Sequence, residues 1–234
     1  MIPRALVRLA ILGFVPSIFM MTGTRAQTSA ADDGLEVERI FGVMPNYGTV
    51  NYPTSRTPAL TVKQKWLLAW RETVDPFNFA NAAIGAGLSQ MGDQTPSYGE
   101  GMGNYGKRYA AAVADLSTQN MFSAGVLASV LRQDPRYFRK GPEYSPLYRV
   151  GYSLSRVVVA RQDSGRATFN TAGIGGMALG IAASNLYYPR ASVKWEVMSG
   201  RVVTSLTSNV IGNLTSEFWP DLQKFLHRHH VPLT

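Results

Sequence analysis

Beyond residue 60, apolar side chains recur at steps of three and four residues, which is the spacing of one face of an α-helix. The prolines of this region stand at the expected starts of these segments or in the gaps between them, and this favours helices over strands. The two clearest stripes are Val113, Leu116, Met121, Ala124, Leu127 and Leu131, and Val202, Leu206, Val210, Leu214 and Phe218. The pattern predicts helices over residues 61–72, 77–91, 105–132, 146–161, 169–188 and 192–218.

Polar residues ahead of these segments fit helix caps. Thr61 and Gln64 have the spacing of a capping box, and Asp75 followed by Pro76 fits an N-cap with proline in the first turn. Pro220 should break or kink the last helix. We therefore expect an all-α fold, a compact bundle of six to seven helices preceded by an extended N-terminal arm.

The first 26 residues have the layout of a secretory signal peptide. Arg4 and Arg8 give a positive start, an apolar run follows over residues 9–21, and small residues precede a cleavage position between Ala26 and Gln27. The run covers about 13 residues, short of the roughly 20 that span a bilayer. An uncleaved anchor helix is the alternative. The pattern predicts export to the periplasm or the outer membrane of a bacterium.

The remaining chain divides into three parts. Residues 27–60 are polar and rich in turn formers, so we expect an extended, partly disordered arm. Residues 61–230 form the expected helical domain, and residues 231–234 form a tail. The three histidines, His227, His229 and His230, lie near the C-terminus, where we expect a solvated basic end and no metal site.

Composition narrows the classes of function. The chain has no cysteine, which excludes cysteine nucleophiles and cysteine-based metal sites and leaves the fold to packing alone. Its net charge is +8, from 23 Lys+Arg against 15 Asp+Glu. This excess gives either an ordinary basic surface or one that favours anionic partners. No basic run exceeds two adjacent residues, so we expect no nucleic acid. The expected partner is a membrane or another envelope component, and we expect no cofactor.

Two predicted helices are rich in small residues. Gly85 lies in the first, and Gly173, Gly176 and Gly180 lie in the second. Because glycine costs about 1 kcal/mol in a helix relative to alanine, we expect these positions to allow close helix packing. Residues 169–188 also carry no charge, so a membrane-embedded hairpin is the alternative to a soluble or peripheral bundle. A homo-oligomer formed through these helices is a further option.

Three aspartates are the candidates for chemistry. Asp115 interrupts a face of small and apolar residues, where a carboxyl group can have a raised pKa and act as an acid or base. Asp134 with Arg136, and Asp163 with Arg166, form two similar turns. These turns would lie about 22 Å apart if a straight helix joined them, so we expect no shared site. In each turn, either the arginine binds an anion or the aspartate caps the turn.

A glycine-rich stretch precedes the third predicted helix and ends in Lys107 and Arg108. A helix N-terminus with glycines and two cations can hold an anion. However, the segment lacks the GxxxxGK[ST] spacing of a phosphate loop. We expect a flexible loop that binds a headgroup or a sugar acid.

Five short strings stand out: YGKRY at 105–109, QDPRYFRK at 133–140, DSGR at 163–166, SNLYYP at 184–189 and EFWPDL at 217–222. Together they resemble a group of exported bacterial cell-envelope proteins to which no activity is assigned. The resemblance covers residues 45–230. It implies export and a single architecture, and it carries no catalytic residue over.

These observations lead to three hypotheses. The first is a non-catalytic exported envelope protein that acts through helix packing and through loops rich in arginine and tyrosine. The second is a hydrolase or transferase on an envelope substrate, in which Asp115, Asp134 or Asp163 works with nearby arginines. The third is a lipid-binding bundle with an apolar cavity between the glycine-rich helices.

Overall fold

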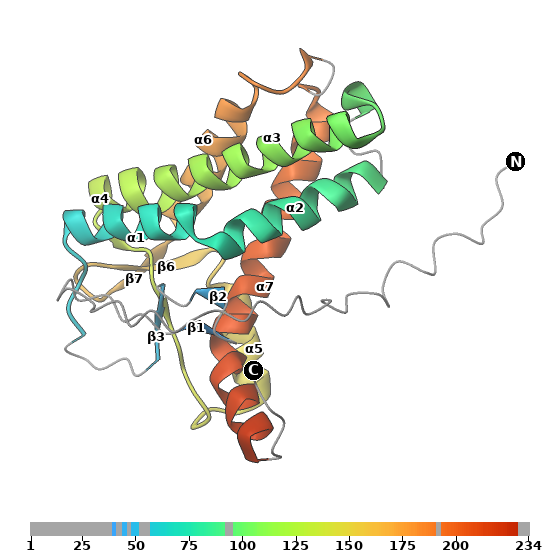
Figure 1. Ribbon diagram of the computed structural model, residues 1–234. Coiled ribbons are helices and arrows are strands. Elements are labelled where there is room, and N and C mark those ends of the chain that lie inside the picture. Colours follow the sequence, from blue (N-terminus) through green and yellow to red (C-terminus); the bar gives the residue numbers. More distant parts are fainter. Residues whose placement is uncertain are drawn as a thin grey trace, which may run out of the picture. The chain divides into compact units, whose positions relative to one another are not determined.

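Helices make up most of the computed structural model, in agreement with the all-α prediction (Figure 1). The structure describes residues 39–40, 44–45, 48–51, 57–91, 96–190 and 193–228. The predicted signal peptide, the start of the predicted arm, His229, His230 and the tail lie outside these residues. The helices are α1 (Val62–Val74), α2 (Pro76–Met91), η1 (Pro96–Tyr98), α3 (Met102–Asn120), η2 (Met121–Leu127), α4 (Ala128–Val130), α5 (Pro146–Ser155), α6 (Thr171–Ser184) and α7 (Trp195–Arg228).

Short strands occupy segments that the sequence predicted as arm, loop or helix end. They are β1 (Arg39–Ile40), β2 (Met44–Pro45), β3 (Thr49–Val50), β4 (Gln133–Asp134), β5 (Tyr137–Phe138), β6 (Val159–Gln162) and β7 (Ala167–Phe169). β4, β6 and β7 form an antiparallel sheet, β1 pairs with β2, and β3 pairs in parallel with β5. The pairing of β3 with β5 fastens part of the N-terminal arm to the helical domain.

The predicted capping box begins α1. The Thr61 hydroxyl accepts from the Gln64 backbone N–H, and the Gln64 side chain accepts in return from the Thr61 N–H at 2.9 Å. Asp75 separates α1 from α2 and has an extended backbone, as expected for a residue before proline. α1 and α2 therefore follow one another at a bend, and both run beside α3 (Figure 1).

The helix predicted over residues 105–132 is a composite. α3 passes into η2, a π-helical segment of seven residues, and then into the short α4. α6 packs against η2 and the end of α3, with Gly176 close to η2 and Gly180 close to α3. A Cβ atom on Gly176 would lie 2.5 Å from the backbone of Ser123, and one on Gly180 would lie 2.5 Å from the Gln119 side chain.

The other two glycines singled out by the sequence lie differently. A Cβ on Gly173 would meet Asn170, the residue that caps α6, whereas a Cβ on Gly85 in α2 would have no atom within 4 Å. α6 itself covers 14 residues. Within the described residues, the structure holds no helix with the length and apolar character to cross a membrane.

The buried carboxylate of Glu217 connects α7 to α5 and to residues 137–141, the segment that precedes α5. Its two side-chain oxygens accept from the Tyr137 hydroxyl, the backbone N–H groups of Lys140 and Gly141, and the Arg149 guanidinium, at 2.8–3.0 Å. Gly141 has a φ of 79°, a conformation that favours glycine, and this turn presents its N–H to Glu217. The Glu217 side chain is fully buried, and each of its oxygens has partners.

The same cluster supports α7 where it contains Pro220. The helix continues through this proline to Arg228, so Pro220 does not end it. Near the proline, the Glu217 carbonyl accepts from Arg139 at 2.8 Å and from Arg149 at 2.7 Å. Both arginines also form ion pairs with Asp221.

We predict that Gly176→Ala destabilises the protein by about 1–3 kcal/mol, because the new methyl group would overlap the backbone of Ser123. Gly85→Ala is the matched control. It adds a methyl group in open space and should be neutral or stabilising by about 0.5–1 kcal/mol. Urea unfolding of both variants measures the difference, and equal effects would contradict the close packing of α6 on η2.

We predict that Glu217→Ala lowers the free energy of unfolding by about 3–5 kcal/mol, because it removes the buried carboxylate that accepts from Arg149, from Tyr137 and from the backbone N–H groups of residues 140–141. Glu143→Ala, at an exposed position, should change it by no more than about 0.5 kcal/mol. Denaturant titration of the two variants measures the contrast. A loss at Glu217 no larger than at Glu143 would show that the cluster does not hold α7.

Candidate ligand-binding cavity

A cavity of about 270 Å³ lies where α1, α3, η2, α6 and α7 meet the small sheet. This is slightly below the range of about 300–1,000 Å³ typical of small-molecule sites. Its lining residues come from segments far apart in the sequence. They are Glu72, Gln119, Asn120, Ser123, Ala124, Gln133, Asp134, Pro135, Arg136, Tyr137, Arg156, Val157, Val159, Ala160, Asn170, Ala172, Gly173, Ile174, Met177, Leu206, Asn209 and Asn213.

Carboxamide side chains dominate the polar part of this lining. They are Gln119, Asn120, Gln133, Asn170, Asn209 and Asn213. Gln133 and Asn170 are fully engaged: each donates to a backbone carbonyl and accepts from a backbone N–H of α6. Asn120 and Asn209 make no side-chain hydrogen bond with any described residue. Their amides can both donate to a ligand and accept from it.

Glu72 contributes a carboxyl group from the C-terminal half of α1. It makes no hydrogen bond or ion pair with another described residue. Its Oε1 lies 3.1 Å from the position that a Cβ would take on Gly48, so the arm passes directly over it. Burial raises the pKa of Glu72 from 4.5 to about 7. At neutral pH this group is therefore divided between a proton donor and a carboxylate.

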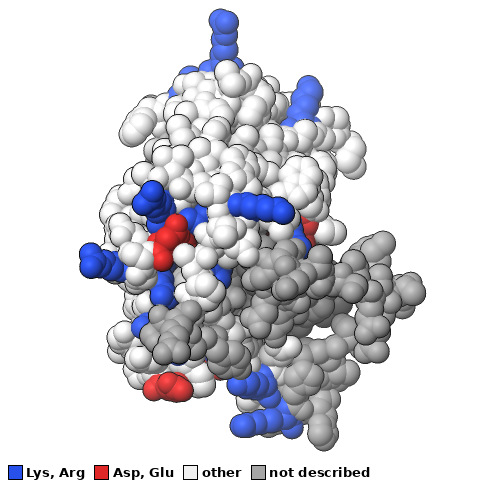
Figure 2. Space-filling model, turned by 90° about the vertical axis from the view of Figure 1, so that its left-hand side faces the viewer, with Lys and Arg blue, Asp and Glu red and all other residues white. Residues whose placement is uncertain are grey.

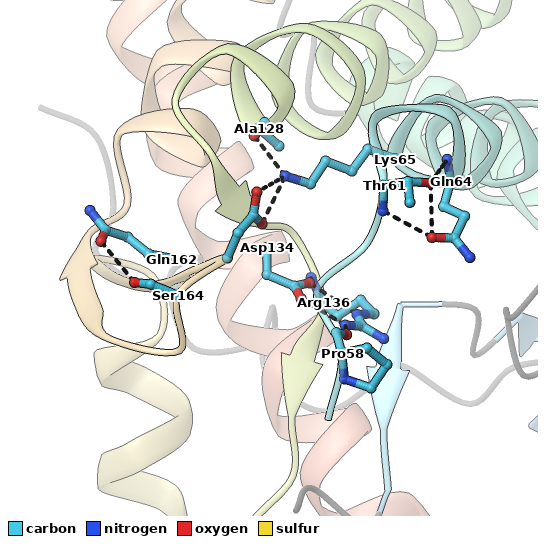
Figure 3. Close-up of polar contacts among 10 residues, drawn as sticks. Pro58, Thr61, Gln64, Lys65, Ala128, Asp134, Arg136, Gln162 and Ser164 are labelled. Carbon is cyan, nitrogen blue, oxygen red and sulfur yellow. Dashed lines mark hydrogen bonds and ion pairs between the residues drawn. The ribbon is translucent and has the colours of Figure 1, made fainter. Parts of the chain in front are cut away.

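The other charged groups of the lining are Asp134, Arg136 and Arg156. Asp134 accepts from the Arg136 backbone and from its guanidinium at 2.7–3.1 Å, and Arg136 also donates to the Pro58 carbonyl (Figure 3). Asp134 and Arg136 thus neutralise each other. Arg156 stacks over the Tyr152 ring at 5.6 Å and forms no ion pair with a described carboxylate. The cavity therefore has one cation without a carboxylate partner among the described residues.

The π-helical segment supplies Ser123 and Ala124 to the lining. π-helical turns are rare and often occur at functional sites, because the extra residue changes the direction of neighbouring side chains. Here the segment directly follows Gln119 and Asn120, which also face the cavity. The π-helical segment thus makes the close contact with α6 and also forms part of the cavity wall.

The structure brings Asp134 and Arg136 to the cavity, but it places Asp163 elsewhere. Both Asp163 oxygens accept from the buried Lys65 ammonium at 2.8 Å. Lys65 also donates to the Ala128 carbonyl at 3.0 Å (Figure 3). Arg166 is exposed in the turn between β6 and β7.

The predicted separation of the two Asp–Arg turns is wrong. Instead of one helix over residues 146–161, α5 ends at Ser155 and the chain turns back as β6. β6 pairs with β4, so Asp134 lies opposite Arg161. The apolar spacing of residues 146–161 did not distinguish a helix from a helix followed by a short strand.

Asp115 lies in a separate cluster. Its two oxygens accept from the hydroxyls of Tyr187 and Tyr188 at 2.5 and 2.7 Å, and the Arg201 guanidinium stacks over the Tyr188 ring at 3.6 Å. Burial raises the pKa of Asp115, while the tyrosine hydrogen bonds and Arg201 oppose the increase. Asp115 joins α3 to the segment that follows α6, and it does not line the cavity.

Lys107 and Arg108 do not form an open anion site together. Lys107 is exposed and donates to Asn104 at 3.1 Å. Arg108 is buried and donates to Ser89 and to the Gly99 carbonyl. Arg108 therefore connects the glycine-rich loop to α2.

Sequence reasoning missed Glu72, Asn120 and Asn209. Nothing in their local pattern distinguishes them from surface residues of amphipathic helices. One weak signal was present. Glu72 lies seven residues, or about two helical turns, after Lys65, on the helix face that carries the buried residues Lys65, Leu68 and Ala69.

Comparisons of the chain with protein-family models, with curated proteins and with solved structures found no match. The cavity and the surface of the molecule are therefore the features from which a function can be inferred.

We predict that Glu72 makes the protein less stable as pH rises from about 5 to 8. Its pKa is about 7 in the folded state and 4.5 ordinarily, so the folded state binds the proton more tightly, and stability falls where that proton is lost. The difference corresponds to about 3 kcal/mol at most.

Denaturant unfolding of the protein and of Glu72→Gln at several pH values tests this prediction. Glu72→Gln should lose less stability over this range, because its amide does not titrate. Glu143→Gln, at an exposed position, should follow the unchanged protein. Parallel curves for all three proteins would refute the prediction.

Proposed function

We propose that this chain is an exported protein of the bacterial cell envelope that binds a small polar organic molecule in its cavity. The observation that carries the proposal is the polar lining of the cavity, in which the Asn120 and Asn209 amides and the Glu72 carboxyl have no hydrogen-bond partner among the described residues. Groups of this kind match a ligand rich in hydroxyl or amide groups. The signal-peptide pattern of residues 1–26 supports export.

The charges of the cavity refine the class of ligand. Arg156 has no carboxylate partner among the described residues, and a guanidinium in this setting favours a carboxylate on the ligand. Sugar acids and short peptides combine a carboxylate with hydroxyl or amide groups, and both chemistries occur in bacterial envelopes. A lipid chain suits this cavity poorly, because it would offer no hydrogen-bond partner to the amides of Asn120 and Asn209.

The raised pKa of Glu72 favours a second function, that of a hydrolase or transferase that acts on the same class of ligand. A carboxyl group with a pKa of about 7 can donate or accept a proton at neutral pH, as a general acid or base must. The Asp134 carboxylate also lines the cavity, but its oxygens are engaged by Arg136. Glu72 would therefore carry the proton transfer.

We predict that a sugar acid or a dipeptide raises the melting temperature of the protein, because a ligand that binds only the folded state stabilises it. Calorimetric titration of the active compound then gives its affinity. Asn209→Leu should weaken this affinity about tenfold or more, because it leaves a polar group of the ligand unpaired.

Asn81→Leu makes the same substitution at an exposed position of α2 outside the cavity, and it should leave the affinity unchanged. If no compound of either class binds, or if both variants bind equally well, the proposed site is wrong. Conversion of the ligand, followed by mass spectrometry, distinguishes the two functions. Product that forms with the protein but not with Glu72→Gln would establish catalysis.

A further inference from the structure

The outer side of α1 carries an exposed apolar stripe. Its members follow one another at four-residue steps: Val62 is 57 % exposed, Trp66 43 %, Trp70 56 % and Val74 42 %. The opposite side of the helix is buried in the core, through Leu68 among others. α1 thus has two apolar sides: one is packed in the core, and the other is largely exposed, with only part of Trp66 covered by η2. We call Val62, Trp66, Trp70 and Val74 the tryptophan stripe.

The two indoles of the tryptophan stripe differ in how they are held. Trp66 lies against η2, since a Cβ on Gly125 would be 3.1 Å from its ring. Trp70 is more exposed, with over half of its surface in solvent. The apolar character continues along α2, where Phe79, Ile84 and Met91 are exposed as well.

The exposed charge near the tryptophan stripe is basic. Over residues 62–91 the acidic residues are Glu72, which lines the cavity, and Asp75, which is buried. Lys63 is exposed beside the stripe, and the whole chain carries a net charge of +8. In the view of Figure 2, lysine and arginine project at many points and acidic groups are few.

We propose that the tryptophan stripe docks on a membrane surface that contains anionic lipids, with α1 lying in the interface. Indole rings favour the boundary between water and hydrocarbon, and nearby cations add attraction to anionic headgroups. A second copy of the chain fits less well. A two-fold contact would bring Lys63 of both copies together, without an acidic group among the described residues on this face of α1 to meet it.

Vesicle sedimentation tests the proposal with the mature protein purified after export, its N-terminus mapped by mass spectrometry. The protein should bind vesicles of phosphatidylcholine with phosphatidylglycerol more tightly than vesicles of phosphatidylcholine alone, and salt should reduce the difference. Trp70→Ser should weaken binding about tenfold, because it removes the most exposed indole of the stripe. Lys63→Glu should weaken binding to the anionic vesicles only.

Trp195→Ser is the matched control, because Trp195 is 78 % exposed at the start of α7, outside the tryptophan stripe. Its binding should equal that of the unchanged protein. Circular dichroism should show that all three variants fold. Absence of vesicle binding, or equal binding by Trp70→Ser and Trp195→Ser, would overturn the proposal. A concentration-dependent dimer that Trp70→Ser abolishes would also overturn it and assign the stripe to a second copy.

Discussion

A carboxylate removed from water needs a partner for each of its oxygens, and the elements that supply partners to Glu217 fix the position of α7. The Glu217 carboxylate accepts hydrogen bonds from Tyr137, from Arg149 and from the backbone N–H groups of residues 140 and 141. α7 in turn contributes Asn209 and Asn213 to the cavity. The wall of the proposed site is therefore held in place by a charge cluster that lies beside it.

The contact between α6 and η2 brings these helices close together and also forms one wall of the cavity. Gly176 lets the two backbones approach closely at Ser123, and Ser123 also lines the cavity. Small residues thus allow helices to meet tightly on one side of the cavity, while polar side chains keep the space beside them open. The tryptophan stripe lies on the outer side of α1, so the proposed ligand site and membrane contact use different sides of one helix.

Much of the helical fold could be predicted from the sequence, because apolar spacing and capping residues are local signals. The start of α1 at Thr61 is an example. The pairing of β4 with β6, the π-helical segment and the burial of Glu72 could not be predicted, since each depends on contacts between distant segments. Asp134 was recognised as a candidate from its turn, and Glu72 was not, because its environment is created by the fold.

The parallel pairing of β3 with β5 sets an order of events during folding. β3 precedes every helix of the described residues, yet its partner strand follows α4. The ribosome therefore makes the arm long before the surface that receives it. A contact between such distant segments closes a long loop and tends to form slowly. Gly48 lies against Glu72, so this carboxyl group becomes covered only when the arm has taken its place beside β5.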